Sequence, residues 1–482
     1  MRHCLIVKQE TALTFVPSLV SRLIWGVLLT FIIFPSWANA ERPSFNSSRY
    51  EENYQFLHDP KLRSDFFDPI KYIPLNQSAS VYMSLGGETR QHFEYIDNNN
   101  WGKGTQDQNG YYLQRYLAHA DLHLGKRLRI FSQFMSGIES GRNGGPRSVD
   151  KDWLDLNQAF IDFKLWENAG QSVTLRAGRQ EIVFGSRRFF NYRERPNMRL
   201  SHDALTGIFR TPHWDVRAFG ARPVTLNRNS FDNISGKAKS VWGLYGVRRK
   251  LPVNFSLNTD LYYLGLHDRD ATFDQGQEEE TRQTLGTRLW GKFKNIDYNF
   301  EFLYQFGTFG QGNIHAYALA SDTGYTLPLN GWGKLRLSLR ADVYSGDDDP
   351  AGSELNSFNP FFPKGKHISQ LAASGLINQR DLHPRATWML DKHWSFTTST
   401  LFIWRDSLND GIYSIGNGLL HSGQSSRARY VGAQPELEVK YTFNPHLDLK
   451  GIFVYFRAGE FLKQASPGRD ITYLGSMLTF RF

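Results

Sequence analysis

The chain has 482 residues, a formal net charge of +9 and a single cysteine, Cys4. One cysteine excludes a disulfide framework and a cysteine-based zinc site. No second apolar run approaches the ~20 residues that a membrane helix needs, and the mean hydropathy is −0.47, although aromatic residues make up 15% of the chain. A polar and aromatic-rich chain of this size is typical of a large soluble β-protein or of an outer-membrane barrel.

The first forty residues predict a secretory leader. Basic residues precede an apolar run over 23–34, and the small residues Ala38 and Ala40 follow it. This order predicts a signal peptide, residues 1–40, cleaved after Ala40. The apolar run is short for a membrane helix and Pro35 follows it, so export with cleavage is favoured over a retained anchor.

The rest of the chain divides into two parts. Residues 41–80 are polar and contain several prolines, and we expect a periplasmic N-terminal extension there, with a plug in the lumen as the alternative. In 81–482, apolar and polar residues alternate with period two, which predicts strands. Eighteen strands are predicted, at about 81–94, 111–124, 128–136, 155–165, 173–182, 204–210, 215–221, 240–249, 255–266, 282–292, 297–307, 314–323, 333–342, 381–390, 394–404, 428–441, 447–456 and 470–482.

The connections between these strands alternate in length. Short links, such as 125–127 and 294–295, alternate with long ones, such as 268–280 and 345–380. This alternation predicts an all-β fold, a transmembrane up-and-down antiparallel β-barrel with periplasmic termini and long extracellular loops. The last predicted strand ends at Phe482 itself, as expected of a strand that pairs with the first and closes the barrel.

The two faces of the predicted strands differ in polarity. In the first strand, Glu88 and Arg90 share one parity, whereas Met83 and Leu85 share the other. We expect the apolar parity to face lipid and the charged parity to face a water-filled lumen. Aromatic residues near strand ends predict interfacial girdles: Tyr111, Tyr112, Trp394, Trp404, Tyr441 and Phe443.

Arginines recur on the polar parity. The predicted lumen-facing residues are Arg90, Arg115, Arg129, Arg288, Arg336, Arg340 and Arg385. Rings of arginine select anions, because a desolvated anion needs fixed hydrogen-bond donors in return. The alternative is that these arginines pair with acids of the same wall, for which Glu88, Asp121, Asp162, Glu301, Asp342 and Glu436 are available.

The stretch 175–190 is also rich in arginine. Arg176 and Arg179 differ in parity, and a β-bulge at Gly178 would turn both inward. We expect Arg179, together with Arg115, near the narrowest level of the pore, and Arg385 nearer a mouth. An arginine–glutamate network that holds the following loop is the alternative for this stretch.

One long connection combines acidic and apolar residues. Asp347, Asp348 and Asp349 are candidate ligands for a structural divalent cation in an extracellular loop, because hard cations prefer carboxylate oxygens; a solvated acidic loop is the alternative. The following stretch, FNPFFP at 358–363, is apolar for a loop and predicts an inward-folded gate. No other cofactor is expected, and the histidines show no metal-ligand or catalytic spacing, so no enzyme is predicted.

Three stretches resemble the alginate-export family of outer-membrane porins. They are RAGRQEIVFG at 176–185, the acidic loop that leads into FNPFFP, and FRAGEFLKQASPGRDITYLGSMLTF at 456–480. The resemblance covers most of the chain after the leader. It implies an eighteen-stranded barrel whose arginine-rich lumen passes a polyuronate outward, with Arg179 and Arg115 among the pore arginines.

Together these features predict an outer-membrane channel for an anionic polysaccharide or a related anionic solute. A porin for neutral sugars or organic acids is the alternative, and an outer-membrane enzyme or adhesin is a third hypothesis from another class. The expected partners are outer-membrane lipids, the transported solute and periplasmic secretion proteins, with no nucleic acid.

Overall fold

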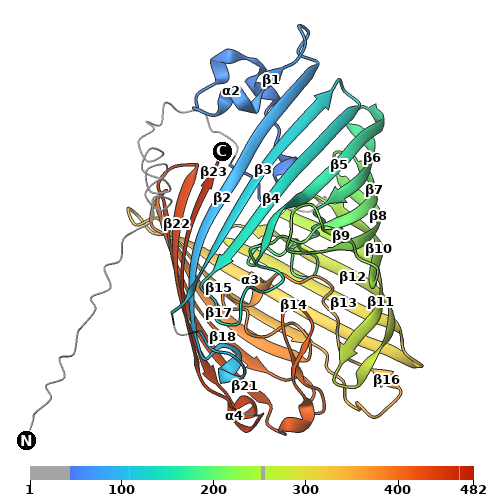
Figure 1. Ribbon diagram of the computed structural model, residues 1–482, viewed down its shortest axis with the longest axis vertical. Helices are drawn as coiled ribbons and strands as arrows, with labels where there is room; N and C mark the ends of the chain where they lie inside the picture. Colours follow the sequence, from blue (N-terminus) through green and yellow to red (C-terminus); the bar gives the residue numbers. More distant parts are fainter. Residues whose placement is uncertain (1–43, 108, 251–255, 466) are drawn as a thin grey trace, which may run out of the picture.

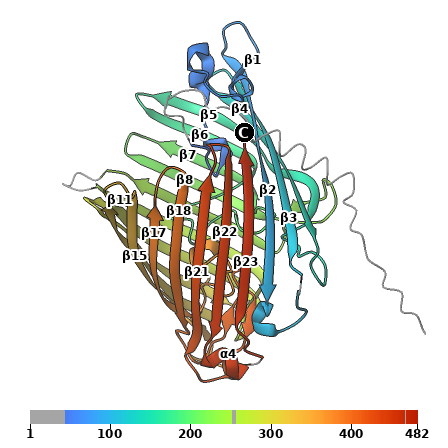
Figure 2. The same ribbon diagram turned by 90° about the vertical axis from the view of Figure 1, so that its left-hand side faces the viewer.

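The computed structural model describes residues 44–107, 109–250, 256–465 and 467–482. Within them, eighteen antiparallel strands close into one barrel around a lumen (Figures 1 and 2). The barrel strands are β2 (Val81–Asp97), β3 (Tyr111–Leu124), β4 (Leu128–Ser140), β5 (Asp152–Asn168), β6 (Gln171–Gln180), β7 (His202–Arg210), β8 (Trp214–Thr225), β10 (Lys239–Arg248), β11 (Ser256–Phe273), β12 (Gly276–Phe293), β13 (Ile296–Phe309), β14 (Gly312–Pro328), β15 (Lys334–Tyr344), β17 (Gln379–Met389), β18 (Trp394–Trp404), β21 (Tyr430–Thr442), β22 (Leu447–Ala458) and β23 (Ile471–Arg481). The predicted all-β up-and-down barrel is therefore confirmed, while the predicted leader, 1–40, lies outside the described residues.

The last strand pairs with the first, and this pair closes the barrel. β23 runs antiparallel to β2, with Phe480 opposite Thr89. The N–H of Phe482 donates to the carbonyl of Gly87 (3.1 Å), and the N–H of Gly87 donates to the carbonyl of Phe482 (3.0 Å). The barrel strands therefore have no unpaired outer edge among the described residues, which a bilayer demands because it offers no partner for a bare strand.

Alternate residues of a strand face the lumen and the lipid. Along β12, Arg282, Thr284 and Arg288 are buried, whereas Leu285 and Leu289, on the other parity, are exposed. This is the arrangement expected from the two parities, because lipid accepts apolar side chains and the lumen solvates or pairs charged ones.

Of the six residues predicted for the aromatic girdle, three are exposed, Trp404 and Tyr441 are partly buried, and one is on the lumen side. Tyr112, Trp394 and Phe443 are exposed on the outer surface. The assignment of Tyr111 is wrong: this residue is buried on the lumen side, where its hydroxyl donates to Glu94 at 2.5 Å. Successive residues of a strand point to opposite faces, so only one of the two neighbouring tyrosines can reach the lipid.

The connections differ at the two ends of the barrel. At one end, which we call the turn end, the links are short, as at 125–127 and 294–295, and Phe482 lies there (Figure 1). At the other end, which we call the loop end, the links include the long loops 181–201 and 345–378.

The prediction of a long connection over 268–280 is wrong. β11 and β12 stay paired as a hairpin as far as Phe273 and Gly276. Phe273 is buried and packs against Phe309 and Tyr413, with 5.5 and 6.1 Å between ring centroids. These contacts give the extra strand residues an apolar partner, so the polar appearance of the sequence there does not produce a loop.

Shorter elements precede β2 or lie in the connections. They are η1 (Arg49–Glu51), η2 (Gln55–His58), η3 (Pro60–Leu62), α2 (Asp68–Lys71), β1 (Ile73–Pro74), η4 (Asn99–Gly102), β9 (Ile234–Ser235), β16 (Glu354–Leu355), α3 (Gly365–Ile368), β19 (Ile412–Tyr413), β20 (Leu419–His421), η5 (Gly423–Ser425) and α4 (Glu460–Ala465). None of the helices in the described ranges is both long and apolar enough to span a bilayer.

Some segments outside the barrel strands enter the lumen. The loops 181–201 and 345–378 fold inward, and α3 of the second loop lies in the middle of the barrel in Figure 1. Residues 44–52, which we call the strap, also lie against the inner wall, since Tyr50 is buried against lumen-facing rings of β4 and β5. Residues 53–80 lie at the turn end, where α2 and β1 pack on β2.

Candidate functional site

The two inward loops are joined to each other inside the barrel. The N–H of Asn191 donates to the carbonyl of Phe362 (2.9 Å), and the N–H of Phe362 donates to the carbonyl of Phe189 (3.0 Å). The rings of Phe190 and Phe362 pack edge to face with 5.0 Å between centroids. The stretch FNPFFP is therefore inside the barrel, and the two loops form one obstruction.

This obstruction is fixed to distant parts of the wall. Arg188 of the first loop forms an ion pair with Glu301 of β13 (3.1 Å). In the second loop, the N–H of Gln370 donates to Glu436 of β21 (2.9 Å). Phe190 also packs on Phe219 of β8, with 5.8 Å between centroids. The loops therefore cross the lumen and are not confined to one side of it.

Two of the predicted pore arginines hold the first loop in place. Arg90 donates to the carbonyls of Glu194 (2.8 Å) and Pro196 (3.0 Å). Arg115 contacts the carboxylates of Glu88 (2.7 Å) and Glu194 (2.5 Å). Both guanidinium groups are almost completely buried. They lie on the lumen parity, as expected, but they are bound to the loop.

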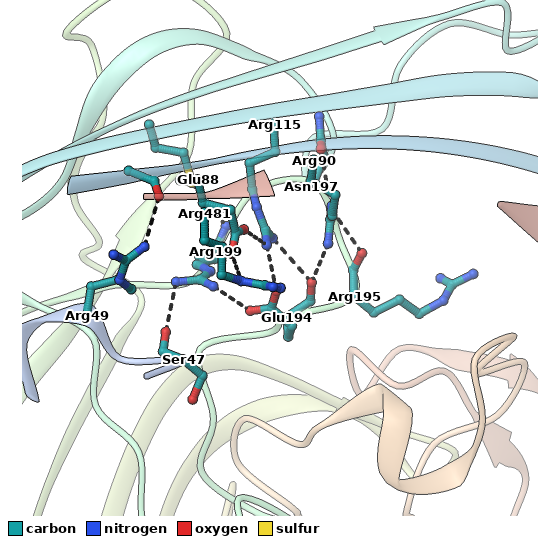
Figure 3. A network of polar contacts seen from close by, with 12 residues as sticks. Ser47, Arg49, Glu88, Arg90, Arg115, Glu194, Arg195, Asn197, Arg199 and Arg481 are labelled. Atoms are coloured by element: carbon teal, nitrogen blue, oxygen red, sulfur yellow. Dashed lines mark hydrogen bonds and ion pairs between the residues drawn. The ribbon is translucent and has the colours of Figure 1, made fainter. Parts of the chain in front are cut away.

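Glu194 is the centre of this network. Figure 3 shows Arg90, Arg115 and Arg199 around it, and Arg199 lies 2.7 Å from its carboxylate. Burial alone would raise the pKa of Glu194, but Arg115 and Arg199 together hold that pKa well below its usual range. The carboxylate is therefore ionised at neutral pH, and it neutralises part of the arginine charge.

Four further predicted arginines are paired with acids of the wall. The pairs are Arg129 with Asp121 (2.7 Å), Arg288 with Asp260 (2.8 Å), Arg336 with Asp297 (2.9 Å) and Arg340 with Asp322 (2.9 Å). Each arginine is on the lumen parity, as expected. Wall pairing, the alternative considered for these residues, describes their geometry, and a paired arginine contributes much less field to the pore than a free one.

Arg179 is on the wrong face for a pore residue. The pairing of β6 with β5 and β7 shows no register shift at Gly178, so the expected bulge is absent from both ladders. Arg179 therefore shares the outward parity of Leu175, while Arg176 points into the barrel and binds Asp162. The inward prediction for Arg179 is wrong because Gly178 has a positive φ of 126° without adding a residue to the strand.

Outside the lumen, Arg179 has partners of its own. Its guanidinium binds Asp203 of β7 (2.9 Å) and donates to the carbonyl of Leu156 (3.3 Å). It also donates to the carbonyl of Asn233, from the connection between β8 and β10 (3.3 Å). Arg179 thus connects the ends of β5, β6 and β7 with the connection between β8 and β10.

Arg385 differs from the other predicted arginines. In the described part of the chain, no carboxylate lies within ion-pair distance of its guanidinium, although Glu438 and Glu436 act on it from farther away, and the side chain is partly exposed. It is paired in register with Ser338 and Ser399, each near the middle of its strand. The expectation that Arg385 lies near a mouth is therefore wrong.

Two loop residues extend this unpaired charge. Lys364 lies at the start of α3, and its N–H donates to the carbonyl of Arg188 (3.2 Å). Burial and the nearby positive charge of Arg187, with smaller effects of Arg340 and Arg385, lower the pKa of Lys364, and the carboxylate of Glu194 opposes this shift without forming an ion pair. Arg187 donates to the hydroxyls of Ser47 and Tyr192 instead of a carboxylate. We call Arg187, Lys364 and Arg385 the cationic cluster.

The sequence analysis did not single out Arg187 or Lys364. Both lie in predicted loops, where strand parity gives no direction for a side chain. The available signal was the position of Lys364, directly after FNPFFP, since an apolar stretch that enters the lumen carries its neighbours with it. Nothing in the local sequence indicates that the two loops meet.

The acidic loop residues do not gather around one point. Asp347 is buried and its N–H donates to Asp410 (3.0 Å), whereas Asp348 and Asp349 are in the following turn. Burial raises the pKa of Asp347 to about 6. Among the described residues, no group of three or more His, Cys, Asp or Glu side chains could hold a metal ion. The cation site therefore stays a prediction without a geometric counterpart.

A cavity of about 1130 Å³ opens at the turn end of the lumen, beside the strap. Its lining includes Tyr50 and Glu51 of the strap together with Arg129, Arg217 and Arg249. We call it the vestibule.

Comparison with known proteins agrees with this architecture. A sequence model described as alginate export matches residues 81–475. The chain belongs to the alginate-export family. Among curated proteins, none matches the chain. As a β-barrel of this porin family, the protein is located in the outer membrane, where lipid surrounds its apolar face.

Solved porin structures share the fold at low sequence identity. Pseudomonas aeruginosa OccD3 (OpdP) superposes with a TM-score of 0.53 at 14% identity, covering 83% of this chain and 91% of that one. P. aeruginosa OpdK, solved with vanillate, gives 0.54 at 11% identity, covering 83% and 98%. P. aeruginosa OccK2 (OpdF), solved in complex with glucuronate, gives 0.50 at 11% identity, covering 86% and 98%. This chain and these solved porins therefore share one barrel architecture.

Proposed function

We propose that this alginate-export family channel passes an anionic solute of the polyuronate class, and that the cationic cluster selects it. The observation that carries the proposal is the position of Arg187, Lys364 and Arg385 inside the barrel without carboxylate partners among the described residues. The short links at the turn end support a periplasmic location of that end.

The other lumen arginines contribute less to this proposal. Of the other predicted lumen arginines, Arg115, Arg129, Arg288, Arg336 and Arg340 have a carboxylate partner that balances their charge, whereas Arg90 is held by carbonyls of the inward loop. Exposed charges are screened over roughly 8 Å at physiological salt, which leaves little effect of a balanced pair on a passing ion. A fixed charge where inward loops narrow the lumen acts at short range on every ion that passes.

A porin for organic acids or neutral sugars is the second candidate. The paired wall favours it, because balanced charge gives a polar pore with weak preference. Two structural neighbours were solved with small carboxylates, one with vanillate and one with glucuronate, and this is a property of those proteins. No described cluster favours the enzyme or adhesin hypothesis.

Reversal of the cluster charge tests the proposal. The variants Lys364→Glu and Arg385→Glu should each lower the anion-to-cation permeability ratio, because each replaces a free cation with an anion at the obstruction. The measurement is the reversal potential of single channels in a planar bilayer under a KCl gradient. Arg115→Glu is expected to act mainly on folding, since it would place a third carboxylate beside Glu88 and Glu194.

Lys392→Glu provides the matched control, because this residue makes the same charge change in an exposed turn between β17 and β18, away from the vestibule lining. Equal effects of Lys392→Glu and Lys364→Glu would indicate a general surface potential and no selective cluster. A wild-type channel that prefers potassium over chloride would exclude anion passage as the function.

A further inference from the structure

We propose that the strap, residues 44–52, is a releasable plug that limits passage through the lumen from the turn end. This inference rests on the channel function but not on its anion preference. The strap lies inside the barrel, next to the loop that carries Arg187, and it is continuous with a chain segment anchored outside the lumen.

An aromatic pocket in the inner wall of the barrel holds the strap. The ring of Tyr50 packs edge to face against Phe131 (6.1 Å between centroids) and Phe160 (5.6 Å). The guanidinium of Arg176 lies 4.5 Å from the ring of Tyr50, and Arg129 donates to the Tyr50 carbonyl at 2.5 Å. Phe131 and Phe160 are on the lumen parity, where water would otherwise cover them. Burying these rings favours the inserted position.

The strap is also continuous with the obstruction. The hydroxyl of Ser47 accepts a hydrogen bond from Arg187 (2.6 Å), and its carbonyl accepts one from Arg199 (3.3 Å). Both arginines belong to the loop 181–201, which is bonded to the loop 345–378. The strap and the two loops therefore lie in the lumen as one connected stack, and the strap is its member nearest the turn end.

The strap can leave without breaking the barrel. Within the described residues ahead of β2, only β1 pairs with a barrel strand, with Ile73 opposite Met83. Arg49 donates to the carbonyls of Gly87 (2.9 Å) and Phe482 (2.8 Å) at the closing pair of strands. Those two carbonyls also accept the ladder bonds of β2 and β23, which remain when Arg49 withdraws.

The geometry supplies both a tether and a space for this movement. β1 keeps the segment attached at the turn end. The vestibule, about 1130 Å³, is lined by the strap residues Tyr50, Glu51 and Glu52, so withdrawal would lead the strap into existing space. A segment held by side chains and short 3₁₀ turns loses few cooperative bonds when it moves.

Tyr50→Ala tests the plug. It removes the ring from its pocket but leaves Arg49 at the barrel closure, so the variant should fold and show a several-fold higher single-channel conductance than the wild type. Tyr112→Ala is the matched control, because it removes an exposed tyrosine from the lipid face. An unchanged conductance in a Tyr50→Ala protein that keeps its heat-modifiable gel mobility would contradict the proposal.

Cross-linking gives an independent test that needs no loss of the strap. In a Cys4→Ser background, Tyr50→Cys and Phe160→Cys are combined and joined by a reducible dithiol-reactive linker. Conductance should be high before cross-linking, fall when the linker is attached and recover on reduction. An unchanged conductance after the linker is attached would contradict the plug proposal. A cation-preferring channel that still responds to the linker would reject the proposed anion passage and leave the plug intact.

Discussion

Arginine has two roles in this lumen, and its partners distinguish them. A guanidinium with a carboxylate or several carbonyls around it fixes a loop or a strand, as Arg90 and Arg115 do. A guanidinium or ammonium without such a partner remains available to a solute, as at Arg385 and Lys364. Parity along a strand shows which way an arginine points, but it does not show which role the residue has.

The anchoring role predicts the effect of Arg90→Ala. The substitution leaves the carbonyls of Glu194 and Pro196 without their donor, at a cost of about 1–3 kcal/mol for each buried group. The loop 181–201 should loosen, which we expect to appear as faster proteolysis of that loop and noisier single-channel current. Arg210→Ala, at an exposed arginine, is the control; equal proteolysis of both variants would argue against the anchoring role.

At the scale of elements, the short helix α3 brings two lysines into the lumen. Burial and the nearby Lys450 lower the pKa of Lys366 to about 8, although Glu438 opposes the shift, and the pKa of Lys364 is lowered as well. A lowered lysine pKa means that the charge is lost at a lower pH than the usual value of about 10.4. Lys366 therefore loses its charge as the pH rises through about 8, and Lys364 loses its charge at a lower pH than an ordinary lysine.

Anion preference should therefore decline between about pH 7 and about pH 9. The measurement is the reversal potential at several pH values. The double variant Lys364→Arg and Lys366→Arg keeps its charge, because arginine remains protonated throughout, so its curve should be flat. A wild-type curve as flat as that of the double variant would show that these lysines do not affect permeation.

The closing strand is a second element with a direct test. Deletion of Phe480–Phe482 removes the last pairs of β23 with β2 and the ion pairs of Arg481 with Glu88 (3.0 Å) and Asp448 (2.7 Å). Barrel assembly should fail, seen as loss of the heat-modifiable band. Phe443→Ala, which removes an exposed turn-end aromatic without touching the closure, should assemble. Normal assembly of the deletion would contradict the closing role.

At the scale of the whole molecule, the strand pattern and the lumen contents differ in how well the sequence predicts them. All eighteen strands, and the faces of most of their residues, follow from period-two alternation, because lipid and water impose opposite demands on the two parities of each strand. The filling of the lumen does not follow. Contacts such as Asn191 with Phe362, or Ser47 with Arg187, join residues far apart in the chain and have no local periodicity.

The misplaced residues show the same limit. Tyr111 and Arg179 are both assigned to the wrong face, the first from its residue type and the second from a bulge that the ladder lacks. Arg385 is placed too near a mouth, whereas its pairing with Ser338 and Ser399 puts it near the middle of the strands. Correct placement of each requires the register with neighbouring strands, which comes from the closed sheet as a whole.

The balanced wall also has a consequence for how such channels diverge. Losing one member of a buried ion pair costs about 3–5 kcal/mol, so residues such as Asp260 and Arg288 are expected to change together among relatives. Lys364 and Arg385 have no ion-pair partner in the described residues, so their substitution leaves no buried carboxylate unpaired. The solute range can therefore change through single substitutions in the cationic cluster. The paired wall is expected to change only through coupled substitutions, so it should be more alike among relatives than the cluster is.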